Sequence, residues 1–411
     1  MIVKEYIKEF EKLGFGMFVH FGVYSVIGKG EWAKCVHNIS DEEYMEYVKQ
    51  FNPDKDWATE LVATAKKAGC KYITLTTRHH DGFSLFDTRG LNDYDAPHVC
   101  GRDLIKEFVD ACNAMGIKPF FYHTLLDWHE KSYKEDFPKY LQYLRDSVEI
   151  LFTQYGEVGG IWFDGMWDRR NDDWEEDALY SMIRSHQPNA MIINNTGLSA
   201  LGALGHIELD SVTFERGKPG PINVEGAPKY VASEMCEIFA EHWGYAKNDY
   251  NFKSLRTMIM ELCDCRRFGS NMLMNVGPMG NGKLRILDKA MLETMGEWVK
   301  MNEEALFLPR PTNVEILLGK DDFVLEKDGT YYLFCHNMYM ALADPNVMKA
   351  TGGETEKQIK LTKKIKSISW LDNGDAIAFT QEADGKTTLD CKPFAYGDHF
   401  VVRIAKIQTE A

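Results

Sequence analysis

Short apolar runs alternate along the chain with longer stretches in which apolar residues recur every three or four positions. The short runs predict strands, and the longer stretches predict amphipathic helices. Strands are expected at 16–21, 72–77, 118–122, 160–163, 191–194 and 271–276, with weaker candidates at 210–213 and 233–239. Helices are expected at 56–68, 103–115, 138–154, 174–186, 252–268 and 288–301. This alternation indicates a parallel sheet, and the strand count approaches that of a closed (β/α)8 barrel.

The second half of the predicted barrel is less regular than the first. Between residues 195 and 251 the pattern is broken and rich in Gly and Pro. Such a region consists either of long functional loops or of a broken part of the barrel. We therefore expect a (β/α)8-like, TIM-type barrel over 1–310 whose second half can depart from regularity.

The pattern changes after "LPRPTN" at 308–313, where apolar residues begin to alternate every second position. Residues 322–335 form two alternating runs about an Asp-Gly pair, which predicts a hairpin. Residues 365–379 turn at Asn-Gly in the same way, and 400–404 is a further strand. These features predict a small antiparallel β-sandwich over 313–411.

Composition and charge narrow the possible functions. The formal net charge of −15 disfavours binding to nucleic acid or to anionic membrane surfaces. No stretch approaches 18 apolar residues, and the amphipathic "MIVKEYIKEFEKLGFG" lacks the apolar core of a secretory signal. Nine scattered cysteines form no disulfide framework or zinc motif. We expect reduced, mostly buried thiols in a cytoplasmic protein.

Polar side chains gather where the predicted strands end. In a parallel barrel these ends meet on one face, which is where such folds carry their active sites. The ends carry His20, the segment Arg78–Asp81, Tyr122 with His123, Asp164, Asn194 with Asn195, Glu215, Glu234 with Glu237, and Asn275. Convergence of several such ends on one rim predicts a site.

Aromatic residues near the same ends suggest a ligand with apolar faces and hydroxyl edges, as a sugar has. They are Trp32, Tyr122, Trp128, Trp162 and Trp243. His79 and His80 are adjacent, and adjacent residues on an extended strand point to opposite sides. They also lack the spacing of metal ligands. We therefore favour neutral imidazoles that bind hydroxyls over a metal site, and we expect no metal or other cofactor.

Two carboxyl groups that flank such a pocket would permit glycoside hydrolysis, one as nucleophile or base and the other as proton donor. Asp164 follows "IWF" and is the candidate nucleophile. Its partner must come from the irregular loops, and spacing alone does not choose among Glu208, Glu215, Glu225 and Glu234.

Several segments, in the correct order, resemble glycoside hydrolase family 29, the α-L-fucosidases. "FGMFVHFGVYSV" (15–26) is similar to the family's first strand with its fucose-binding His, and "EWAKCV" (31–36) to its Glu-Trp loop. The paired-His segment "KYITLTTRHHDGFSLFDT" (71–88) is the nearest match. "FYHTLLDWH" (121–129), "IWFDG" (161–165), "HWGYAKND" (242–249) and "NMLMNVGPMGNGKL" (271–284) are similar to later barrel segments.

The resemblance implies roles for individual residues. Asp164 would be the nucleophile, and the sugar would be held by His20, Glu31, Trp32, His79, His80, Tyr122 and Trp162. For the acid/base, "DSVTFERG" (210–217) stands where the family has a Thr-Pro-Glu-like segment, which favours Glu215. Glu234, in "SEMC", resembles the Glu of Trp-Glu-x-Cys and is the second choice; Glu208 is the third.

The sequence departs from the family pattern at three positions. Thr196 stands where an Arg often follows strand five, Ser233 replaces the Trp of Trp-Glu-x-Cys, and Phe21 stands where Trp is common. If that Arg contacts the sugar ring, the pocket has lost a donor, and a different sugar or linkage would then suit it.

The resulting hypothesis is a retaining exo-α-L-fucosidase that acts on glycosides or glycoconjugates with terminal fucose. The alternatives are a glycosidase for a related 6-deoxy or L-galacto-configured sugar, a carbohydrate-binding pseudoenzyme, and a metal-dependent barrel enzyme that uses His20, His79 and His80. The sandwich domain is expected to be structural.

Overall fold

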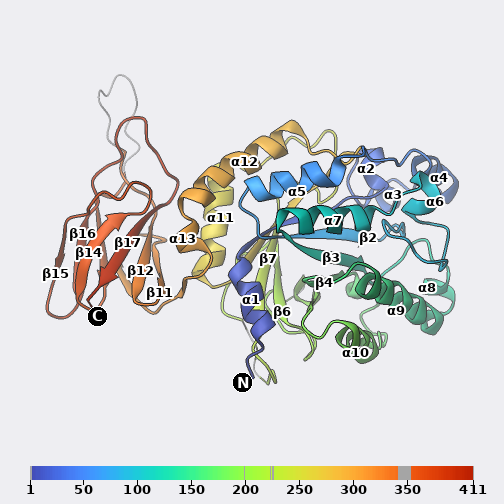
Figure 1. Cartoon of the computed structure of the whole chain (residues 1–411), viewed down its shortest axis with the longest axis horizontal. Coiled ribbons are helices and arrows are strands. Elements are labelled where there is room, and N and C mark those ends of the chain that lie inside the picture. The colour runs from blue at the N-terminus through green and yellow to red at the C-terminus, as the bar shows by residue number, and fades with distance from the viewer. Residues whose placement is uncertain (1, 199, 223, 225, 341–352, 411) are drawn as a thin grey trace. The chain divides into compact units, whose positions relative to one another are not determined.

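Eight parallel strands form a closed barrel in the computed structural model, which describes residues 2–198, 200–222, 224, 226–340 and 353–410 (Figure 1). The strands are β1 (Phe15–Val19), β2 (Tyr72–Arg78), β3 (Lys118–Thr124), β4 (Gly160–Asp164), β5 (Met191–Asn194), β6 (Ser211–Glu215), β7 (Ala232–Ile238) and β8 (Asn271–Val276). β1 pairs with both β2 and β8, which closes the sheet. The predicted barrel is confirmed, including the two weaker strands, β6 and β7.

The barrel strands are apolar on both faces because both faces are buried. Every residue of β1, β2, β7 and β8 is buried. Alternate residues along each strand point inward, and the inward set, which includes Phe18, Tyr72, Phe120 and Trp162, forms one interior cluster. The short continuous runs seen in the sequence are therefore strands that are covered on both sides.

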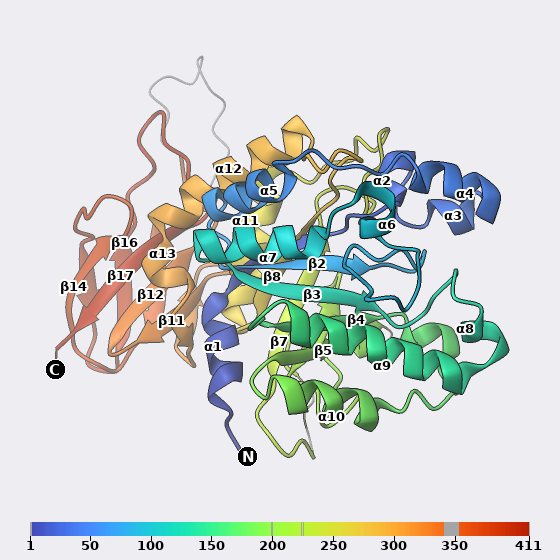
Figure 2. The same ribbon diagram turned by 45° about the vertical axis from the view of Figure 1, so that its right-hand side comes forward.

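Long helices cover the outside of the first half of the barrel (Figure 2). They are α5 (Trp57–Lys67), α7 (Leu104–Met115), α9 (Phe137–Gln154) and α10 (Glu176–His186), close to the predicted ranges. In α7, the side chain of Asp103 accepts a hydrogen bond from the Lys106 N–H at the start, and Gly116 ends the helix with φ 70°. Shorter helices lie in the loops: α2 (Tyr24–Ile27), α3 (Ala33–Val36), α4 (Asp41–Val48), α6 (Ala96–Cys100), α8 (Ser132–Glu135) and the 3-10 helix η1 (Met166–Arg169).

The second half of the barrel is irregular, as the sequence predicted. In the described part of the chain, the 3-10 helix η2 (Thr196–Leu198) is the only helix between β5 and β7. At the N-terminal ends of the strands, α1 (Glu5–Leu13) buries Ile7 and Phe10 in the interior cluster. The Phe10 ring lies 5.7 Å from the rings of both Tyr72 and Phe120. One end of the barrel is thus closed by a helix, and the other carries the long loops.

The chain divides into two compact units, residues 1–253 with 270–293, and residues 254–269 with 294–411. The second unit holds α11 (Leu255–Arg267), α13 (Glu303–Leu306) and two antiparallel sheets, and α12 (Ile286–Met301) runs from the first unit into the second. One sheet has the order β10 (Glu315–Leu318), β13 (Glu356–Lys360), β16 (Lys386–Asp390), β15 (Phe379–Gln381). The other has the order β14 (Ile365–Trp370), β17 (Arg403–Thr409), β12 (Thr330–Cys335), β11 (Phe323–Lys327), β9 (Arg310–Pro311).

The core of the second unit confirms the predicted sandwich. Leu333 and Ile407 from the five-stranded sheet share a buried cluster with Ile359 and Leu389 from the four-stranded sheet. The hairpin predicted over 322–335 is also present: β11 pairs with β12 through Asp328 and Gly329, which have φ 51° and 81°. Positive φ at both central positions is what a type I′ turn requires.

The second predicted hairpin, over 365–379, is wrong beyond its turn. Asn373 and Gly374 do reverse the chain, and Ser369 bridges Ala376. The chain then leaves for the other sheet, where β15 pairs with β16. A period of two cannot distinguish a strand that stays in its sheet from one that crosses the sandwich. The last strand, expected at 400–404, begins at Arg403 and extends to Thr409.

The nine cysteines are free thiols, and seven of them are buried, as expected. Among the described residues, the helices are too short or too polar to cross a lipid bilayer.

Candidate active site

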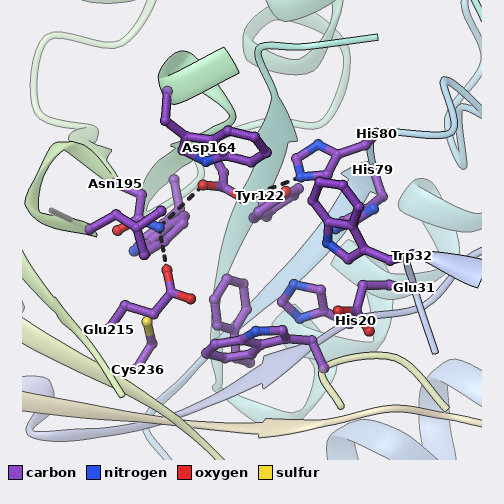
Figure 3. Close-up of a pocket in the computed structure, with 15 residues that line it drawn as sticks. His20, Glu31, Trp32, His79, His80, Tyr122, Asp164, Asn195, Glu215 and Cys236 are labelled. Atoms are coloured by element: carbon purple, nitrogen blue, oxygen red, sulfur yellow. Dashed lines mark hydrogen bonds and ion pairs between the residues drawn. The ribbon is translucent and has the colours of Figure 1, made fainter. Parts of the chain in front are cut away.

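A cavity of about 160 Å³ lies at the carboxyl ends of the barrel strands (Figure 3). It is small beside the roughly 300–1,000 Å³ of pockets for drug-sized ligands, so it suits a single small ring. Its lining residues are Phe18, His20, Glu31, Trp32, His79, His80, Tyr122, Trp162, Asp164, Trp167, Asn195, Leu198, Glu215, Cys236 and Trp243. The nine residues predicted from the sequence as nucleophile, first-choice acid/base and sugar ligands all lie in this wall.

The strand alternation explains how β4 supplies two of these residues. Gly160, Trp162 and Asp164 are separated by two positions and face the barrel interior, while Ile161 and Phe163 face outward. Phe163 contacts the ring of Tyr180 on α10 at 6.2 Å. An apolar strand therefore ends in a carboxylate because its last inward position opens into the cavity.

Both adjacent histidines line the cavity, contrary to the expectation that they point to opposite sides. β2 ends at Arg78, and its pairing with β3 shifts register between Thr76 and Arg78, so the strict alternation of a strand no longer applies. The rings of His79 and His80 lie only 4.2 Å apart. A turn after the strand thus places two imidazoles where an extended strand would place one.

The histidines are neutral at physiological pH. Burial lowers the pKa of His20 and of His80 to about 4, and it lowers that of His79 well below its usual range. Asn275 fixes His20 by a hydrogen bond of 2.7 Å between Nδ1 and the amide oxygen. Neutral imidazoles can donate to and accept from hydroxyl groups. Among the described residues, no group of three or more His, Cys, Asp or Glu is arranged to hold a metal ion.

Asp164 is surrounded by polar groups on three sides. The Tyr122 hydroxyl donates to Oδ2 at 3.0 Å, and the Asn195 amide donates to Oδ1 at 3.2 Å. His80 Nε2 lies 3.6 Å from Oδ2. These contacts stabilise the carboxylate charge and fix its orientation, and only 16% of the side chain is exposed.

Glu215 is linked to Asp164 through the side-chain amide of Asn195. The same Asn195 nitrogen donates to Glu215 Oε2 at 2.5 Å, so this oxygen and Asp164 Oδ1 lie no more than 5.7 Å apart, the sum of the two distances. Burial raises the pKa of Glu215 to about 7, and the negative charge of Asp164 adds to the effect. Glu215 is therefore a carboxyl group that can both give and take a proton near neutral pH.

The remaining acid/base candidates lie elsewhere. Glu234 is buried in the barrel interior, where it accepts hydrogen bonds from the Tyr72 hydroxyl and, at 3.1 Å, from Trp162 Nε1. Burial raises its pKa to about 7 as well, so geometry rather than acidity separates it from Glu215. Glu208 precedes β6 and contacts Lys229 at the opposite end of the barrel. Glu225 lies outside the described residues.

A model of the alpha-L-fucosidase family matches residues 3–304. The chain belongs to the alpha-L-fucosidase family. The tissue alpha-L-fucosidase of Bos taurus is 27% identical over 74% of this chain and 70% of its own length. The alpha-L-fucosidase of Dictyostelium discoideum is 24% identical over 87% and 86%. The predicted assignment to this family of glycoside hydrolases is confirmed.

Solved structures of alpha-L-fucosidases share the fold over almost the whole chain. Isoenzyme 1 from Paenibacillus thiaminolyticus has a TM-score of 0.84 at 28% identity and covers 99% of both chains. A structure from Bacteroides thetaiotaomicron has a TM-score of 0.80 at 22% identity and covers 99% of this chain and 97% of its own. That structure is of a trapped covalent intermediate in complex with 2-fluoro-fucosyl fluoride.

The three departures from the fucosidase pattern lie outside the wall of the cavity. Thr196 packs against Gly205, and it is the preceding residue, Asn195, that reaches the two carboxyls. The Ser233 hydroxyl hydrogen-bonds that of Ser270 at 2.5 Å. Phe21 is buried near Phe51, at a ring distance of 5.3 Å.

Six lining residues of this fucosidase received no role from the sequence. Phe18, Cys236 and Trp243 lie in segments that resemble the family but received no role there, and Trp167 and Leu198 carried no signal beyond being apolar. Asn195 was noted only as a polar strand end. Because its Nδ2 contacts both carboxyls, it is the most informative omission.

Proposed function

We propose that this chain is a retaining exo-α-L-fucosidase with Asp164 as nucleophile and Glu215 as acid/base. The observation that carries the proposal is the pair of carboxyl oxygens held within 5.7 Å of each other by one amide nitrogen. Retaining glycosidases have their carboxyl groups about 5–5.5 Å apart, whereas inverting enzymes need about 6.5–9.5 Å to admit a water. The trapped covalent intermediate of the Bacteroides relative supports the same mechanism by analogy.

In the first step, a carboxylate oxygen of Asp164 attacks the anomeric carbon while Glu215 protonates the leaving oxygen. This forms a glycosyl ester and releases the aglycon. In the second step, Glu215 takes a proton from water, the water oxygen attacks the anomeric carbon, and Asp164 departs as a carboxylate. Two inversions at the same carbon give net retention.

The rest of the wall is suited to one 6-deoxy sugar. The ring hydroxyls would be bound by His20, His79, His80 and Glu31. The carboxylate of Glu31 is fixed by the Gly244 N–H, which donates to its Oε2 at 2.8 Å. The aromatic faces of Phe18, Trp162 and Trp243 offer an apolar contact for a methyl group. The small volume supports removal of one terminal sugar rather than cleavage within a chain.

The decisive experiment is Asp164→Ala assayed on an aryl α-L-fucoside with and without azide. We expect loss of hydrolysis by about 10⁴-fold or more, and partial rescue by azide that yields a fucosyl azide of inverted configuration. Asp168→Ala is the matched control, because Asp168 on η1 accepts a hydrogen bond from the Tyr133 hydroxyl on α8 and does not line the cavity. Full hydrolysis by Asp164→Ala would refute the assignment.

Three further tests concern the preferred sugar, the class of protein and the need for a metal. Aryl L-galactosides and other 6-deoxy glycosides, run beside the L-fucoside, would reveal a different preferred sugar. Binding of fucose without turnover by the wild-type chain would indicate a pseudoenzyme. Loss of activity on chelation would favour a metal-dependent reaction.

A further inference from the structure

The side-chain amide of Asn195 lies between the two candidate catalytic carboxyls. Its two N–H bonds are directed to Asp164 Oδ1 and Glu215 Oε2 (Figure 3). Its Oδ1 accepts a hydrogen bond from the Thr213 hydroxyl at 3.2 Å, and its backbone N–H donates to the Phe163 carbonyl at 2.9 Å. The amide is thus oriented with its nitrogen toward both carboxyls by contacts with β4 and β6.

We infer that Asn195 is a positioning residue that sets the separation of Asp164 and Glu215 and favours the second, deglycosylation step of the reaction. This inference rests on the proposed function. A donor to Asp164 stabilises the carboxylate, which makes Asp164 a better leaving group when the glycosyl ester breaks. A donor to Glu215 favours the ionised form, which is the form that accepts a proton from water in that step.

The groups that face Glu215 give the direction of a pH effect. Asp164 on β4 and Glu31 after β1 raise its pKa, whereas the Asn195 hydrogen bond and Arg216 lower it. Arg216 Nη2 lies 3.5 Å from Glu241. The Tyr122 hydroxyl and the Cys236 thiol, on the strands β3 and β7, also face the site and are neutral, since burial raises the pKa of both. Loss of the Asn195 donor therefore raises the pKa of Glu215.

The test is Asn195→Ala on an aryl α-L-fucoside. Asn195→Ala should lower kcat about tenfold and lower KM with it, because the glycosyl-enzyme accumulates. A burst of aglycon should precede steady state, and azide, which needs no general base, should restore kcat. The basic limb of kcat/KM should move to higher pH, because that limb reports the proton on Glu215 in the free enzyme.

Two comparison variants make the test robust. Thr213→Val loosens the amide without removing its donors, so it should show the same signature at smaller amplitude even if Asn195→Ala folds poorly. Asn195→Gln keeps a donor and should restore part of the kcat lost in Asn195→Ala. An equal fall of kcat and kcat/KM, with no burst and an unmoved limb, would overturn the inference, as would wild-type kinetics.

The same assay separates this inference from the proposed function. If Glu215→Gln keeps the basic limb or Asp164→Ala keeps full activity, the catalytic assignment itself is wrong. If those two variants behave as proposed and Asn195→Ala does not, only the role of Asn195 fails.

Discussion

The strand β6 has a carboxyl group at each end, and the surroundings of the two groups differ. Asp210, just before the strand, is fully buried and accepts hydrogen bonds from the Tyr6 hydroxyl at 2.9 Å and the Ile192 N–H at 2.8 Å. It also pairs with Arg184 and, at 2.8 Å, with Lys229. Glu215, at the other end, is held by a neutral amide and faces the negative charge of Asp164.

This difference separates a structural carboxyl from a chemical one. Two cations and two neutral donors surround Asp210 and offset the cost of burying a charge there. Among the described residues, Glu215 has no comparable set of cations and donors around it. Its pKa is about 7, so it gains or loses a proton near neutral pH. In barrels of this kind the N-terminal end serves stability and the C-terminal end serves catalysis. Here one five-residue strand connects the two cases.

The largest expected effect on catalysis concerns Glu215, at the C-terminal end of β6. Glu215→Gln should lower kcat/KM on fucosides with poor leaving groups about 10²–10⁴-fold, because the general acid is lost. The fall should be smaller with an activated nitrophenyl leaving group, which departs without protonation. The free energy of unfolding should change little or rise, since the amide does not repel Asp164. Chemical denaturation and leaving-group dependence check both statements.

Substitution of Asp210, just before β6, should lower stability and leave catalysis unchanged. Asp210→Asn leaves Arg184 and Lys229 without their buried counter-charge, which should lower the free energy of unfolding by about 3–5 kcal/mol. The folded fraction should keep the kcat of the wild-type enzyme. Tyr6→Phe is a milder variant that removes one hydrogen bond to the same carboxyl and should cost about 1 kcal/mol. A large fall in kcat for Asp210→Asn would erase the distinction between the two ends.

A third carboxyl, that of Glu234 in the barrel interior, extends the comparison to the pH dependence of stability. Burial holds its folded pKa at about 7, above the value of about 4.3 for an unfolded chain. The folded state then binds more protons than the unfolded state, so this contribution to stability is complete below pH 4 and is lost as the pH rises through 7. Glu234→Gln should remove a pH-dependent loss of stability of up to about 4 kcal/mol.

The kinetic outcome for Glu234→Gln is the control for Glu215. Both groups titrate near pH 7, but only Glu215 lines the cavity. Wild-type kcat/KM should fall tenfold for each pH unit above about 7, and this limb should persist in Glu234→Gln and vanish in Glu215→Gln. Disappearance of the limb in Glu234→Gln would instead make Glu234 the acid.

The sequence predicted the barrel and most of its site because both depend on short-range patterns. Apolar runs with polar ends placed Asp164 and Tyr122 correctly, since parallel strands bring their carboxyl ends together. What failed depends on long-range geometry. The strand after Asn373 and Gly374 crosses to another sheet, and the turn after Arg78 brings His79 and His80 to one wall. The position of Asn195 between two carboxyls depends on how β4, β5 and β6 lie side by side, and no short sequence pattern around Asn195 indicates it.

The smallest expected effect on catalysis concerns the hydroxyl of Tyr122 on β3, in the wall of the cavity. Tyr122→Phe removes the donor to Asp164 Oδ2 but keeps the ring, which lies nearly parallel to those of His79 and Trp162. A hydrogen bond to a charged group contributes about 1.5–3 kcal/mol, so kcat should fall about 10–100-fold while the unfolding free energy changes by under about 1 kcal/mol.

Tyr140→Phe is the matched control for Tyr122→Phe. Tyr140 is also fully buried, and its hydroxyl donates to the Leu125 carbonyl at 2.6 Å, away from the cavity wall. Its loss should cost about 1 kcal/mol of stability and leave kcat unchanged. If Tyr122→Phe and Tyr140→Phe instead lower the free energy of unfolding equally and neither lowers kcat, the reactivity of Asp164 does not depend on its hydrogen-bond donors. The contrast between compensated and uncompensated carboxyls would then rest on Glu215 alone.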